Sequence, residues 1–152
     1  MAAWAADCAE RVLPFFEEAF QKDDRPRKAI EVCRTRVRTG VFKMADIRGA
    51  SLAAHAAARE VKENNAACFA ARAAGQAVAT AHVPQHAFGA AYYALKAVMA
   101  ADPDHAEAKI AKERNWQSRH LSKNLREEVL NKIIIQKSRD RILIKIQKGA
   151  DF

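Results

Sequence analysis

The chain has 152 residues, of which 26 are Lys or Arg and 18 are Asp or Glu, and 50% are apolar. This length and balance fit one globular domain with a hydrophobic core better than several domains. The 34 alanines, with only five glycines and four prolines, favour helices and argue against a β-sandwich or a doubly wound sheet. We therefore predict an all-α protein in which residues 1–152 form a single compact bundle or stack of about six to seven helices.

The N-terminal third predicts two helices. Apolar residues at helical spacing indicate a first helix over Ala3–Phe20, with a kink or restart at Pro14, because proline lacks an N–H and its ring clashes with the preceding turn. Acidic residues ahead of Pro26 resemble a helix cap and predict a second helix that runs to about Thr39, where Gly40 provides a stop.

The alanine-rich middle predicts three more helices, over Lys43–Glu63, Ala66–Ala81 and Gln85–Ala101, with a turn at Asn64. The Ala66–Ala81 helix carries a row of small residues at a spacing of four, which lets another backbone approach closely: Ala67, Ala71, Gly75 and Ala79. We expect this helix to be central.

The C-terminal third starts with a helix signal at Pro103, which predicts a sixth helix to about Gln117, and a seventh is expected over Leu121–Ile133. The basic, isoleucine-rich segment 131–152 differs from the rest in composition. Its isoleucines at 142, 144 and 146 alternate as in a strand, while Ser138 and Asp140 fit the start of a short helix. We favour the helix, and we expect the segment to dock on the body or on a second subunit.

The charge is uneven along the chain. Residues 1–24 sum to −4 and residues 25–48 to +6. Arg27, Arg34 and Arg38 share one helical face, so we predict that they contact an anionic partner. That partner is either an acidic protein surface or nucleic acid, although no nucleic-acid-binding module is visible.

A second candidate site is a polar pocket around the Ala66–Ala81 helix. Because Arg72 lies on an otherwise apolar helix, its guanidinium must reach the solvent, pair with a carboxylate or point into a polar cavity. If a polar pocket exists, we expect it to be built from His55, Arg72, Gln76, Thr80, His82, His86 and Tyr93. The spacing of the histidines matches no metal-binding motif, so we predict no metal and no other cofactor.

The cysteines and the N-terminal residues indicate the cellular compartment in which we expect the protein. Cys8, Cys33 and Cys68 are odd in number and widely spaced, no secretory segment is recognisable, and no uncharged run of about 20 apolar residues is present. We expect a cytoplasmic protein with reduced thiols and no membrane partner.

Four phrases of the chain resemble the immunity proteins of bacterial polymorphic-toxin systems. They are AWAADCAERVLPFFEEA, DDRPRKAIE, LAAHAAARE and ARAAGQAVATAHVPQHAFGAAYYALKAV, and the resemblance covers roughly Ala3 to Leu130. It implies an all-α protein that binds a cognate toxin and blocks it without catalysis. The tail after Leu130 departs from the pattern.

We therefore expect a non-catalytic protein that sequesters and neutralises a toxin, and we keep a nucleic-acid-associated basic module as the alternative. An enzyme or metal protein that uses His55, His82 and His86 ranks last, and homo-oligomerisation stays open.

Overall fold

The computed structural model of the chain describes residues 1–147. Within this range, seven helices of ten residues or more account for most of the chain, and the all-α prediction is confirmed. These helices are α1 (Ala2–Val12), α3 (Arg25–Thr39), α4 (Met44–Glu60), α5 (Asn65–Ala79), α6 (His86–Ala101), α7 (Ala106–Arg119) and α8 (Lys123–Lys132). Shorter elements are α2 (Pro14–Glu17), the 3-10 turn η1 (Pro103–His105) and the strands β1 (Ile133–Ser138) and β2 (Arg141–Ile146).

The predicted helix boundaries rest on identifiable residues. The chain restarts at Pro14, the first residue of α2, as its missing N–H requires. Gly40 ends α3 with φ 70°, a left-handed conformation that glycine adopts without a Cβ penalty. The side chain of Asn64 caps α5 by accepting a hydrogen bond from the N–H of Ala67 at 3.1 Å. Together these local signals explain why the predicted helices form where they do.

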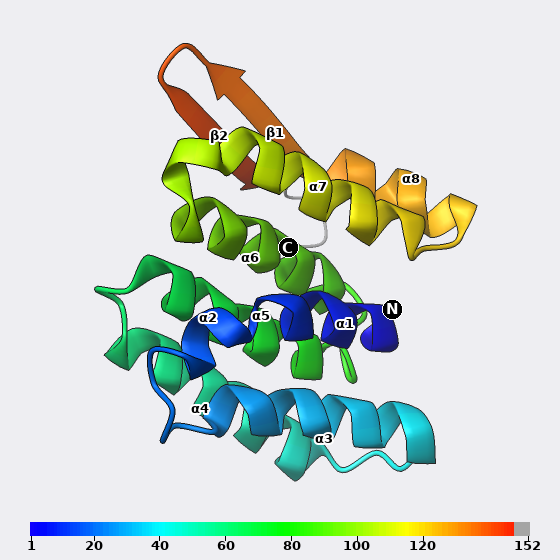
Figure 1. The fold of residues 1–152 in the computed structure, drawn as a ribbon. Helices are drawn as coiled ribbons and strands as arrows, with labels where there is room; N and C mark the ends of the chain where they lie inside the picture. The colour runs from blue at the N-terminus through cyan, green and yellow to red at the C-terminus, as the bar shows by residue number, and fades with distance from the viewer. Residues whose placement is uncertain (148–152) are drawn as a thin grey trace.

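The helices stack in layers, with the hairpin at one end and the α3–α4 pair at the other (Figure 1). α5 lies in the centre and contacts α1, α2, α3, α4 and α6, as the row of small residues predicts. No helix within residues 1–147 is both long enough and apolar enough to span a bilayer.

Two glycines allow α5 to approach its neighbours closely. A Cβ at Gly75 would lie 2.8 Å from Nε2 of His55, and one at Gly89 would lie 2.7 Å from Oε1 of Gln76. These polar side chains therefore occupy the space that alanine would fill. The hydroxyl of Ser51 also donates to the carbonyl of Gly75 at 3.0 Å, which ties α4 to α5.

The helix expected in segment 131–152 is wrong for the part that the structure describes, because residues 133–146 form an antiparallel β-hairpin. The register pairs Ile133 with Ile146 and Ile135 with Ile144. Cross-strand partners point to the same face of a sheet, so the alternation places these isoleucines together against the helices. Residues 148–152 of that segment lie outside the described range.

A buried polar network joins α1 to α7. Glu113 is only 4% exposed, and its carboxylate accepts hydrogen bonds from Nε of Arg11 at 2.9 and 3.2 Å. The side-chain Nε2 of Gln117, a residue that is 2% exposed, donates to the carbonyl of Ala91, and the backbone carbonyl of Gln117 accepts from Nε1 of Trp4 at 2.9 Å. Each of these buried groups is therefore hydrogen-bonded, as stability requires.

Candidate partner-binding surface

Two arginines on the basic face of α3 contact carboxylates of α1 and α2. Nε and Nη2 of Arg27 donate to the carboxylate of Glu17, both at 2.7 Å, and Nη1 lies 3.6 Å from Glu10. Nη2 of Arg34 donates to Asp7 at 2.9 Å and also to Glu10. The hydrogen bonds from Arg27 lower the pKa of Glu17 below its ordinary value. Two of the three predicted contact arginines are therefore already paired within the chain.

Arg38 differs from these two. It lies in the last turn of α3, is exposed, and makes no ion pair with any residue between 1 and 147. The structure thus separates the predicted contact residues, because only Arg38 projects a free cation from the far end of the helix.

Exposed apolar side chains gather around Arg38. Seven large apolar residues within the described range are exposed, and four of them lie at the end of α3 and the start of α4. Val41 and Phe42, in the connecting loop, are 56% and 46% exposed. We define the α3–α4 surface as Val37, Arg38, Val41, Phe42 and Met44. Exposed apolar clusters rimmed by polar residues are typical of protein interaction sites.

A groove of about 560 Å³ lies directly beside this surface, between α3 and the loop that leads into α4. Its apolar lining comes from Val32, Val41 and Ile47. The guanidinium of Arg36 lies 5.6 Å from the ring centroid of Phe42, and its Nε is buried with no hydrogen-bond partner among the described residues. A buried donor without an acceptor costs free energy, so this guanidinium is incompletely satisfied beside the groove.

The charge around the surface is mainly positive. Lys43 and Arg48 are exposed and, like Arg38, make no ion pair within the part of the chain that is described. Glu31 and Asp46 are the acidic residues that line the groove. This balance favours a partner with acidic groups, because charge complementarity steers association and excludes wrong partners.

The predicted polar pocket forms in part. Gln76, His86 and Tyr93 line a cavity of about 280 Å³ between α5, α6 and the end of β2, where Ile146 contributes to the wall. Nδ1 of His86 lies 2.7 Å from Oε1 of Gln76. Burial lowers the pKa of His86, and nearby His82 lowers it further. Three predicted residues therefore meet in one cavity.

The other predicted pocket residues lie around that cavity. His55 is half-buried against Gly75, and its pKa is lowered by burial and by the positive charge of Arg72. The guanidinium of Arg72 lies 5.8 Å from the Tyr93 ring centroid. Thr80 is turned away, because its hydroxyl donates to the carbonyl of Gln76 in its own helix.

His82 is exposed at the junction between α5 and α6, with its ring centroid 5.6 Å from that of His86. Across residues 1–147, no group of three or more His, Cys, Asp or Glu side chains is arranged to hold a metal ion. The pocket is thus a half-buried polar cluster in which the neutral forms of His55 and His86 are favoured.

The three cysteines are free and buried. Burial raises the pKa of the Cys33 thiol to about 11 and raises that of Cys8 well above its ordinary value. Because the thiolate is the reactive form, these two thiols are poor nucleophiles.

Sequence reasoning named Arg38 but missed the apolar side chains of the α3–α4 surface. A local signal was present, because Val41 and Phe42 directly follow the helix-ending Gly40, where turns are usually polar. Charge spacing also predicted Arg27 and Arg34 as contact residues. Spacing along one helix cannot show that both arginines pair with carboxylates of α1 and α2.

A sequence model of the family described as "Imm-5 like putative immunity protein" matches residues 1–124. No curated protein matches the chain, and no solved structure matches it. The matched region contains α1 to α7 and the whole α3–α4 surface, and it ends before the hairpin.

Proposed function

Because this chain belongs to the Imm-5 like immunity protein family, we propose that it binds a cognate toxin in the cytoplasm and neutralises it without catalysis, through the α3–α4 surface. The toxin would place apolar side chains on Val41 and Phe42 and acidic groups near Arg38.

One observation carries this proposal: apolar side chains and unpaired basic groups are exposed together at a single end of the molecule. Interface cores are enriched in aromatic residues, Met and Arg. Phe42, Met44 and Arg38 provide this combination, and all three lie within the region that the family model matches.

The alternative of nucleic-acid binding depends on free basic residues along α3. Arg27 and Arg34 contact carboxylates of α1 and α2, so phosphates would have to displace these contacts. The exposed apolar cluster also has no role in binding a phosphate backbone. We therefore favour a protein partner.

The experiment is a capture of partners from a nuclease-treated native lysate by the tagged full-length chain, with the captured proteins identified by mass spectrometry. The double substitution Val41→Asp/Phe42→Asp should abolish capture of the specific partner. Arg38→Glu should weaken capture, because it would repel the acidic groups that the partner places near this residue. Expression of the identified partner alone should then arrest growth, and expression of the partner together with the native chain should restore growth.

Leu143→Asp is the matched control, because Leu143 is 40% exposed and lies on the hairpin, away from the α3–α4 surface. All variants should keep the helical circular dichroism of the native chain. Equal capture by the double variant would contradict this surface, and loss of all capture on nuclease treatment would favour the nucleic-acid alternative.

A further inference from the structure

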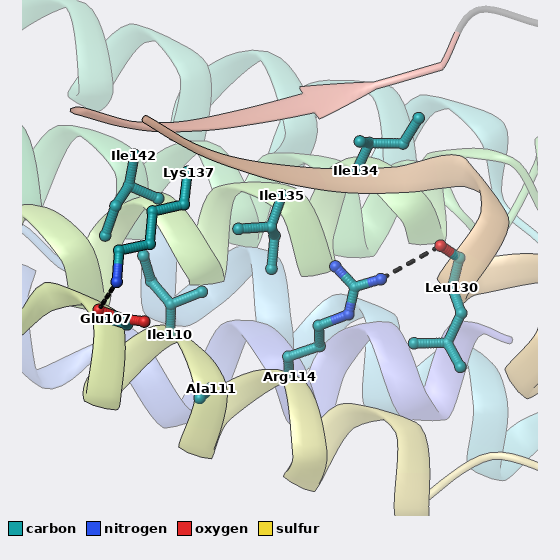
Figure 2. Close-up of a pocket in the computed structure, with 9 residues that line it drawn as sticks. All are labelled: Glu107, Ile110, Ala111, Arg114, Leu130, Ile134, Ile135, Lys137 and Ile142. Carbon is teal, nitrogen blue, oxygen red and sulfur yellow. Dashed lines mark hydrogen bonds and ion pairs between the residues drawn. The ribbon is translucent and has the colours of Figure 1, made fainter. Parts of the chain in front are cut away.

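A second groove lies at the opposite end of the molecule, between α7, the end of α8 and the hairpin (Figure 2). Its volume is about 430 Å³. Its apolar walls are contributed by both secondary-structure types: Ile110, Ala111, Leu130, Ile134, Ile135 and Ile142. The family model ends at residue 124, before β1 and β2, so about half of the residues that line this groove come from the segment beyond the matched region.

The hairpin leaves this groove open because its inner face is only partly covered. Ile133 and Ile144 are 2% and 4% exposed and pack into the core. Ile135 and Ile142 lie on the same face by register, but they are only half-buried and line the groove. The groove therefore has an apolar surface that no described residue covers.

One end of the groove carries a guanidinium without an acidic partner. Arg114 projects from α7 under β1, and its Nη2 donates to the carbonyl of Leu130 at 3.2 Å (Figure 2). No carboxylate within residues 1–147 lies within ion-pair distance of it. Burial lowers the pKa of Arg114, and no neighbouring negative charge compensates for that burial. A guanidinium has five N–H donors, so most of these donors are free to bind an anion.

The other end of the groove is closed by a neutralised pair. Nζ of Lys137 lies 2.6 Å from Oε2 of Glu107. Glu107 and Arg114 are seven residues apart on α7, which corresponds to about 10 Å along a helix. Between these two ends, every lining side chain is apolar. A ligand for this groove thus needs one anionic end and an apolar body of about that length.

From this arrangement, we propose that the groove binds an amphipathic monocarboxylate, with the carboxylate on the Arg114 guanidinium and an acyl chain along Ile110, Ile135 and Ile142. A planar carboxylate matches the fork of a guanidinium. An acyl chain suits the apolar walls better than a peptide, because peptide amides would lose hydrogen bonds to water there without regaining them.

The test is isothermal titration calorimetry of the full-length chain with octanoate below its micellar concentration, together with NMR of the isoleucine methyl groups. We expect saturable one-site binding that shifts the methyls of Ile110 and Ile135. Each methylene removed should weaken binding about fourfold, so hexanoate should bind about 15-fold more weakly than octanoate.

Two substitutions separate the charge from the groove. Arg114→Gln should weaken octanoate binding roughly tenfold or more and leave binding of the neutral 1-octanol unchanged. Ala111→Trp, at an exposed position that lines the groove, should fill the space and abolish binding of both compounds without disturbing the core. Arg119→Gln, on the same helix but outside the groove, is the control.

Three results would overturn the proposal. They are titration without saturation, equal octanoate binding by the native chain and both groove variants, and binding of a capped Leu-Glu-Leu peptide where octanoate does not bind. The last result would make the groove a peptide site.

Discussion

The two sides of α1 hold charge in opposite ways. Toward α3, its carboxylates pair with Arg27 and Arg34 at the surface, where the side chains involved are 38% to 43% exposed. Toward α7, Arg11 reaches Glu113, which is 4% exposed and shares its carboxylate with Gln117. The same helix therefore makes ion pairs with exposed carboxylates on one side and, on the other, an ion pair whose carboxylate is buried although Arg11 itself is 34% exposed.

The difference teaches that burial decides what an ion pair contributes. Exposed pairs gain little, because water and salt screen them and because two long side chains must be ordered. A buried carboxylate has lost its hydration, so removing its partner leaves an uncompensated charge. The ring of Trp116, 4.1 Å from the Arg11 guanidinium, adds a cation–π contact on the buried side.

The largest expected effect comes from removing the cation that faces the buried carboxylate of Glu113. Arg11→Met should lower the free energy of unfolding by about 1–3 kcal/mol, because Glu113 is 4% exposed and keeps only the hydrogen bond from Gln117. Urea denaturation at neutral pH measures this. The double variant Arg11→Met/Glu113→Gln should recover much of the loss, since it removes both charges. A loss below about 1 kcal/mol in the single variant would show that the two sides of α1 do not differ.

An intermediate effect is expected from the half-buried histidines. The pKa values of His55 and His86 are lowered in the folded state, so below about pH 6.5 the unfolded chain binds more protons than the folded chain. The free energy of unfolding should therefore be constant above that pH and fall as the pH decreases toward the folded-state values.

Urea denaturation at about pH 7.5 and pH 5.5 tests this, because the carboxylates titrate mainly below that window. His55→Gln should reduce the pH dependence, since glutamine carries no charge at either pH. An equal pH dependence in the native chain and His55→Gln would mean that burial of His55 has no energetic consequence.

The smallest effect is expected on the exposed side of α1. Arg27→Gln and Arg34→Gln should each lower the free energy of unfolding by about 0.2–1 kcal/mol, and less at high salt. Thermal denaturation at low and high ionic strength measures both. If either variant loses as much as Arg11→Met, exposure does not explain the difference between the two sides.

The helices could be predicted because their signals are local. Pro14, Gly40 and Asn64 mark helix ends in the sequence and mark them in the structure. The hairpin could not be decided in the same way, because the alternation over residues 142–146 is short and a strand depends on its partner. Only pairing with β1 and packing against α6 made it a strand.

The same distinction applies to the candidate surface. Charge spacing correctly places Arg27, Arg34 and Arg38 on α3, yet it cannot reveal which carboxylates of α1 and α2 lie opposite. That requires the packing of helices distant in sequence, and this packing leaves Arg38 free beside exposed Val41 and Phe42.

The sequence alone determined the helical class, the helix limits and the family resemblance, because helix propensity, capping and turn residues act within a few positions of one another. The tertiary structure alone decided which charges are buried, which are paired and which remain exposed. Burial and ion pairing depend on side chains that packing brings together from separate helices, as Arg11 and Glu113 show across an interval of 102 residues.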